Sequence, residues 1–78
     1  MKKWEYYIVR QDQEHGVIKG NYFVITLEDG TTYPVDERKN IFSQLGEKGW
    51  ELVTTTEFTG SYGTISVLYF FKRELKNK

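Results

Sequence analysis

The chain of 78 residues contains no cysteine and a single proline. Without thiols it can form neither a disulfide nor a thiolate metal site, and small secreted domains usually depend on such cross-links. No hydrophobic run approaches the ~20 residues of a membrane span. The basic start, Met1-Lys2-Lys3, is not followed by the apolar region of a signal peptide. We therefore expect a cytoplasmic protein that makes no membrane contact.

Neither sign of charge is in excess, because eleven basic residues balance eleven acidic ones. Strong general attraction to nucleic acid or to an anionic membrane is therefore not expected. Aromatic residues, by contrast, make up 17% of the chain. Large rings bury much area per residue, which allows a short chain to build a core without cross-links. We expect one compact domain over residues 1–78, since the chain is too short for a second core.

The first half of the chain predicts three strands. Period-two alternation predicts a strand over Trp4–Val9. The polar stretch 11–20 predicts a loop, and Asp29-Gly30 predicts a two-residue hairpin turn that sets Thr26 opposite Tyr33. Pro34 cannot donate to a ladder, so the second arm is short or lies at an edge. This loop and hairpin, over about residues 11–35, form an insertion before the helix.

A helix of about 12 residues is expected next, with Asp36 as its N-cap. Ile41, Phe42 and Leu45 form its apolar stripe, which can cover only one face of a sheet. Gly46 inside this helix costs about 1 kcal/mol relative to alanine. Close approach of the helix backbone to the sheet is the compensation that we expect. Gly49 suits the left-handed position after the last turn.

Two further strands, Trp50–Phe58 and Ile65–Phe71, are expected on either side of a turn at Gly60–Gly63. The last strand is apolar on both faces, which suits a central position antiparallel to the first and fourth strands. Lys72-Arg73-Glu74 ends it, and a frayed tail follows over about 75–78. The expected fold class is α+β, a small, mostly antiparallel sheet of four or five strands in the order β-ββ-α-β-β, with one helix on one face.

The junction between helix and strand carries a resemblance to a known family. It reads Leu45-Gly46-Glu47-Lys48-Gly49-Trp50-Glu51-Leu52-Val53, and its structural residues are Leu45, Gly46, Gly49, Trp50 and Leu52. Together with Trp4-Glu5-Tyr6 and Phe71-Lys72-Arg73-Glu74, it resembles the bacterial domain of unknown function 4177 family. The resemblance implies a compact domain with a strand, a helix and two more strands, and it implies no activity. The inserted hairpin departs from this family. Trp50 is expected to fill the core beneath the junction.

No combination of residues in the sequence predicts catalysis. His15 is the only histidine, and we expect its side chain to be solvated in a polar loop. No nucleophile stands beside a base, no glycine loop is typical of phosphate binding, and no set of ligands suggests a metal. We therefore expect a protein that is not an enzyme, with no catalytic residue, no cofactor and no metal.

The expected function is binding or self-association through a second apolar sheet face. The residues that we expect there are Ile65, Val67, Tyr69, Phe71, Tyr7 and Val9. Such a patch is larger than a lone soluble domain usually exposes. Either the inserted hairpin covers it or it packs on a partner, and a homodimer is the partner that we favour over an unidentified protein.

Two alternative functions remain from the sequence. Tyr69 and Phe71, with Lys72 and Arg73 at one end, could present a stacking surface for single-stranded nucleic acid. The balanced charge argues against that interpretation. The other alternative is a small-molecule-binding domain or an accessory to an enzyme.

Overall fold

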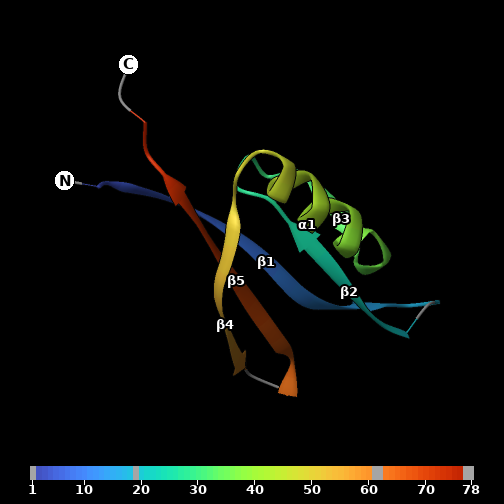
Figure 1. The fold of residues 1–78 in the computed structure, drawn as a ribbon. Coiled ribbons are helices and arrows are strands. Elements are labelled where there is room, and N and C mark those ends of the chain that lie inside the picture. Colours follow the sequence, from blue (N-terminus) through green and yellow to red (C-terminus); the bar gives the residue numbers. More distant parts are fainter. Residues whose placement is uncertain (1, 19, 61–62, 77–78) are drawn as a thin grey trace.

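The computed structural model of the chain describes residues 2–18, 20–60 and 63–76. They form a five-stranded sheet and one helix preceded by a 3-10 turn (Figure 1). The elements in chain order are β1 (Trp4–Gly16), β2 (Gly20–Thr26), β3 (Thr32–Pro34), η1 (Val35–Glu37), α1 (Arg38–Glu47), β4 (Glu51–Thr59) and β5 (Ile65–Glu74). The predicted α+β class, with the helix between the third and fourth strands, is confirmed.

The strands lie in the order β3-β2-β1-β5-β4, and all neighbours are antiparallel. The predicted central place of β5, antiparallel to both β1 and β4, is confirmed. Its ladder with β1 runs from Trp4 opposite Glu74 to Asp12 opposite Ser66. The inserted hairpin extends the sheet on the far side of β1. Leu27 and Val35, in the same insertion, pack against the core on the helix side.

The prediction of a loop over residues 11–20 is wrong. β1 continues to Gly16 and pairs with β2 as far as Gly20. Beyond Asp12, β1 has lost its β5 neighbour, so its end and the start of β2 form a two-stranded arm (Figure 1). Water reaches both faces of such an arm, and polar residues are therefore tolerated there without the alternation that identifies a half-buried strand.

The last strand is also longer than predicted. Lys72–Glu74 does not end β5 but pairs with the start of β1. Leu75 is not frayed, because its backbone N–H donates to the Lys3 carbonyl at 2.8 Å. The last two residues of the predicted tail, and residues 61–62 of the predicted turn, lie outside the described part of the chain.

The β2–β3 turn is longer than the two-residue turn that Asp29-Gly30 suggests. Ile25 lies opposite Tyr33, one position away from the predicted register. The Leu27 N–H donates to the Thr31 carbonyl at 2.9 Å, which closes the loop. The Thr31 N–H instead donates to Asp29 Oδ1 at 2.9 Å, and this bond lowers the pKa of the Asp29 carboxyl. The prediction that the Pro34 strand is short or lies at an edge is confirmed, since β3 has three residues and is the edge strand.

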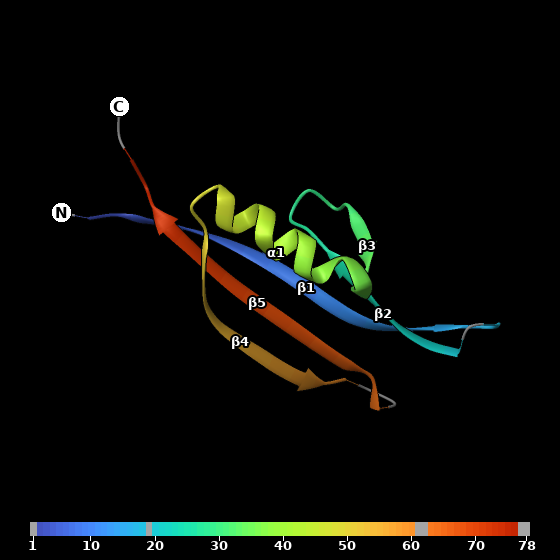
Figure 2. The ribbon, with the colours of Figure 1, turned by 45° about the vertical axis from the view of Figure 1, so that its right-hand side comes forward.

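The core lies between α1 and one face of the three central strands (Figure 2). Its buried apolar residues are Val9, Ile25, Ile41, Leu45, Tyr69 and Phe71. The half-buried Phe42 places its ring edge-on, 4.9 Å from the ring of Tyr69 and 5.1 Å from that of Phe71. The predicted apolar stripe of the helix is therefore the surface that seats on the sheet.

One polar side chain, Gln11, is buried beside this core. Its Oε1 accepts hydrogen bonds from the Tyr69 hydroxyl at 2.9 Å and from the Arg38 guanidinium at 3.1 Å. A buried amide oxygen without partners would cost about 1–3 kcal/mol. These bonds instead tie the start of α1 to β1 and β5.

The helix begins and ends differently from the prediction. Asp36 lies in η1 and is not an N-cap, since neither η1 nor α1 has a side-chain capping bond. Gly49 has the predicted left-handed conformation, with φ of +90°. Gly46 does not approach the sheet, because a Cβ added there would meet no atom within 4 Å. The expected packing reason for Gly46 is therefore wrong.

These two glycines give a matched pair of substitutions. Gly49→Ala should lower the free energy of unfolding by about 1 kcal/mol, because alanine is strained at positive φ. Gly46→Ala should raise it by about 0.5–1 kcal/mol, because alanine is the better helix former and the space is open. Urea denaturation followed by circular dichroism measures both. A stabilising Gly49→Ala would contradict the assigned backbone conformation.

Candidate interaction surface

The six residues that we predicted for an exposed interface lie on the side of the sheet that α1 covers. Val9 is fully buried there, and Tyr69 and Phe71 are also buried. The half-buried Tyr7 and Val67 pack against the same core, and Ile65 is half-buried at the start of β5. The prediction of an uncovered face at these residues is wrong. Both faces of β5 are apolar, so its sequence pattern alone does not predict which of the two faces the helix covers.

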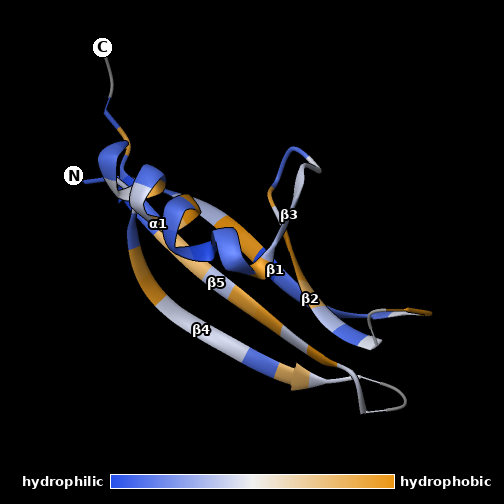
Figure 3. Cartoon of the chain, turned by 90° about the vertical axis from the view of Figure 1, so that its right-hand side faces the viewer, coloured by the Kyte–Doolittle hydropathy of each residue, from blue (hydrophilic) through white to orange (hydrophobic). Residues whose placement is uncertain are grey.

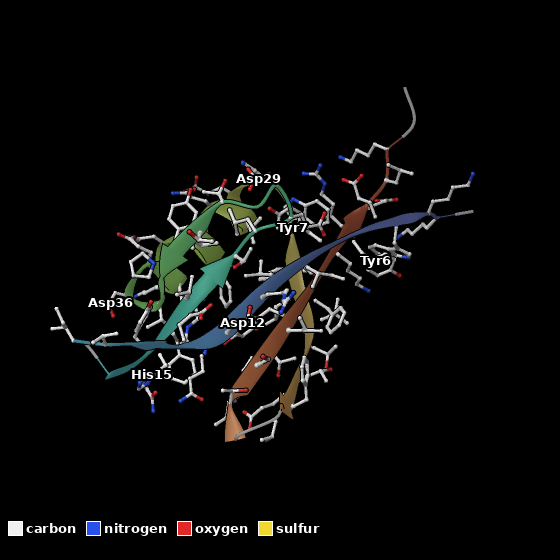
Figure 4. All side chains as sticks on the ribbon, turned by 180° about the vertical axis from the view of Figure 1, so that it is seen from behind. Tyr6, Tyr7, Asp12, His15, Asp29 and Asp36 are labelled. Atoms are coloured by element: carbon white, nitrogen blue, oxygen red, sulfur yellow. The ribbon has the colours of Figure 1, made fainter. Side chains whose placement is uncertain are left out.

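The opposite side of the sheet carries an apolar surface that α1 does not reach. We call it the open face and define its apolar part by six side chains: Trp4, Tyr6, Ile8, Phe58, Leu68 and Phe70. Cross-strand pairing brings them together, since Ile8 lies opposite Phe70 and Tyr6 lies opposite Lys72. Tyr6 is 62% exposed, and Tyr6 and Tyr7 leave β1 on opposite sides (Figure 4).

Charged side chains on the open face form pairs of opposite sign. Arg10 lies 3.1 Å from the Asp12 carboxylate, which also accepts a hydrogen bond from the Ser66 hydroxyl at 2.8 Å. Lys72 lies 3.8 Å from the Glu51 carboxylate and 4.2 Å from the centre of the Trp4 ring. The basic groups are therefore partly neutralised by neighbours, and the open face has no uniform sign.

Strand β4 lies beyond the reach of the helix at the outer edge of the sheet (Figure 2). All nine of its residues are exposed. Apolar residues stand at both of its ends and threonines lie between (Figure 3). An irregularity between Leu52 and Thr54 shifts its register on β5, so Leu52 lies opposite Phe71 and Thr54 opposite Phe70. Leu52, which we expected in the structural junction, is 47% exposed.

The junction after α1 is held by Arg73, whose contacts there were not predicted from the sequence. Arg73 lies 4.3 Å from the Trp50 ring centre, donates to the Lys48 carbonyl at 2.8 Å and forms an ion pair with Glu5. Trp50 is half-buried and its ring centre lies 5.5 Å from that of Tyr7. Trp50 therefore packs at the margin of the core, between an aromatic ring and a guanidinium.

A groove of about 360 Å³ lies beside this junction. Its walls are Tyr7, Leu27, Tyr33, Glu37, Asn40, Ile41, Gln44, Leu45, Lys48, Trp50 and Arg73. Burial raises the pKa of the Tyr7 hydroxyl. A hydrogen bond with the Glu28 backbone lowers this pKa, and the nearby carboxylates of Asp29 and Glu28 raise it. The groove has aromatic walls and an amide-bearing rim.

His15 is exposed, as predicted, but it lies in β1 and not in a loop. Its Nδ1 lies 3.0 Å from the Asn21 side-chain oxygen across the ladder with β2. Within residues 2–18, 20–60 and 63–76, no three His, Cys, Asp or Glu side chains gather in a way that could hold a metal ion.

In the part of the chain that the structure describes, α1 is too short and too polar to cross a membrane.

Comparisons with protein-family models, with curated proteins and with solved structures found no match to this chain. The resemblance of the Leu45–Val53 junction to the family of unknown function therefore stays a prediction from its motifs.

The raised pKa of Tyr7 predicts a loss of stability in alkali. The folded state favours the neutral hydroxyl, so the contribution of Tyr7 to the free energy of unfolding is fully present below about pH 10, the ordinary tyrosine pKa. It is lost as the pH rises through the higher pKa of the folded state. Between about pH 9.5 and 11, the urea midpoint of Tyr7→Phe should therefore fall less steeply than that of the unaltered chain. Tyr6→Phe controls for the loss of one tyrosine, and equal slopes for all three proteins would contradict the assignment.

Proposed function

We propose that the protein is a non-catalytic self-association module in which the open faces of two copies pack together. The observation that carries the proposal is the surplus of exposed surface. The chain exposes 6089 Å², whereas a monomeric protein of 9.3 kDa exposes about 5,000 Å². The surplus of roughly 1,100 Å² exceeds the ~800 Å² that each partner buries in a standard interface.

The dimensions of the chain agree with this surplus. Its radius of gyration is 14.5 Å, and a compact domain of this length has one of about 11–12 Å. The sheet is long and carries helical cover on one side only (Figure 2). A second layer on the open face would complete the arrangement in which a sheet is buried on both sides.

A second copy of this chain fits the chemistry of the open face. Its centre is apolar, with Ile8, Leu68 and Phe70 on neighbouring strands. Its charges are of both signs, on Arg10 and Lys72 against Asp12 and Glu51. A two-fold contact sets a surface against itself, so a surface with both signs can be complementary to its own copy.

A charge placed on the open face should break this contact. Tyr6→Glu removes an exposed ring from the contact and introduces a carboxylate that the dimer must desolvate even where it pairs with Lys72 on the neighbouring strand. We expect the dissociation constant to rise by about tenfold or more. Tyr6 is 62% exposed, so the fold of the single chain should be retained. Light scattering coupled to size exclusion, over a dilution series, measures the change.

The matched control is Val17→Glu, which places the same charge at a fully exposed position on the tip of the β1–β2 arm. It should leave the dissociation constant unchanged. Equal masses for Tyr6→Glu and the unaltered chain at every concentration would refute the role of the open face.

A second candidate function is binding of single-stranded nucleic acid on the same face. Trp4, with Lys72 over its ring, and the exposed Tyr6 are the observations that favour it, because bases stack on such rings. The pairing of Arg10 with Asp12 and of Lys72 with Glu51 weakens it, since fewer basic groups remain for phosphates.

Fluorescence anisotropy of a labelled oligothymidine distinguishes the two functions. Because its basic groups are paired, we expect the chain to give no salt-dependent rise in anisotropy at low ionic strength. Binding that weakens with salt and is lost in a Trp4→Ala variant would favour the nucleic-acid function instead. Tyr33→Ala is the control, since this partly exposed ring lies on the edge strand β3 opposite the buried Ile25, on the other side of the sheet.

A further inference from the structure

The two edges of the sheet are built differently. On one side β3 has only three residues and ends at Pro34, which has no N–H to offer a further strand. On the other side β4 has nine residues and pairs with β5 alone in the described sheet. Natural sheets shield long edges with prolines, lysines or covering elements, because an open edge pairs with other chains.

Strand β4 has no proline, no lysine and no covering element, and its charged residues are Glu51 and Glu57. Its one irregularity, between Leu52 and Thr54, lies near its start and leaves Thr54–Thr59 in regular pairing with β5. Val53–Thr56 is a run of β-branched residues, which favour extended pairing. All nine residues are exposed on both faces of the sheet. An edge that is long, unshielded and rich in β-branched residues is suited to receive another strand.

We propose that β4 pairs with β4 of a second copy, antiparallel, around a two-fold axis at Thr56. This contact lies at the edge of the sheet and goes beyond the face contact of the proposed function. A two-fold contact is made by one surface meeting itself, and β4 supplies both sides. The two sheets would then continue into one another.

Charge and side-chain direction select the register. With Thr56 opposite Thr56, Thr54 lies opposite Phe58, and the like charges of Glu57 are set apart, each opposite Thr55. Centring the pair on Glu57 would place two carboxylates face to face, which is destabilising. Centring it on Thr55 would set Leu52 opposite Phe58, and the irregularity after Leu52 places these two side chains on opposite faces.

Cysteine cross-linking tests this register directly, because the chain has no cysteine of its own. Thr55 lies opposite Tyr69, on the side of the sheet away from the open face, so a thiol there does not report on the face contact. In Thr55→Cys, the two thiols would be diagonal neighbours across the axis, roughly 7–8 Å apart. A short bis-maleimide should therefore yield a covalent dimer on a denaturing gel. Thr32→Cys, at the protected β3 edge, is the matched control and should cross-link several-fold less. Equal yields at the two positions would overturn the edge contact.

A charge variant on the other side of the sheet separates the edge contact from the face contact. Thr55 lies opposite Tyr69, away from the open face. Thr55→Glu would set a carboxylate directly opposite Glu57 of the second copy, which is destabilising, and Val17→Glu is its control. If both contacts form and their two-fold axes cross at right angles, they close into a tetramer, which Thr55→Glu and Tyr6→Glu should each reduce to a dimer. Loss of mass in Tyr6→Glu alone, with no preferential cross-link at position 55, would leave the proposed function standing and remove the edge contact. Cross-linking at position 55 with no effect of Tyr6→Glu would do the reverse.

Discussion

A helix of ten residues with one apolar stripe can seat on only one face of a sheet and across only a few strands. In this protein α1 buries Ile41 and Leu45 against β1, β2 and β5. The other side of those strands, and the whole of β4, receive no cover from it (Figure 2). The surplus of exposed surface follows from this limit. Self-association is proposed as its consequence, since a second copy supplies the missing layer.

The long ladder between β1 and β5 determines what that uncovered surface contains. Antiparallel pairing from Trp4 to Asp12 sets aromatic and aliphatic residues of the two strands side by side on each face. On the covered face Tyr69 also bonds to Gln11, whose oxygen accepts from Arg38, so the position of the helix is fixed by polar contacts as well as by packing. The apolar surface on the open face is thus a direct result of a strand that is apolar on both sides.

Much of this fold could be predicted from the alternation of Trp4–Val9 and Ile65–Phe71 and from Gly49, whose left-handed conformation ends the helix. The face that the helix covers could not, because a strand apolar on both sides has no preferred side. The extent of β1 was missed because an arm exposed on both faces has no buried side to impose alternation. The role of Arg73 was missed because its contacts with Glu5 and Trp50 join residues far apart in the chain.

Small-angle X-ray scattering of the unaltered chain tests the central claim most directly, because it measures mass and shape in one experiment. Self-association predicts a forward scattering that corresponds to a multiple of 9.3 kDa, with a radius of gyration above the 14.5 Å of one copy. A mass of 9.3 kDa with a radius near 14.5 Å, unchanged up to the highest concentration, would contradict it. The open face and β4 would then be exposed in the working form of the protein.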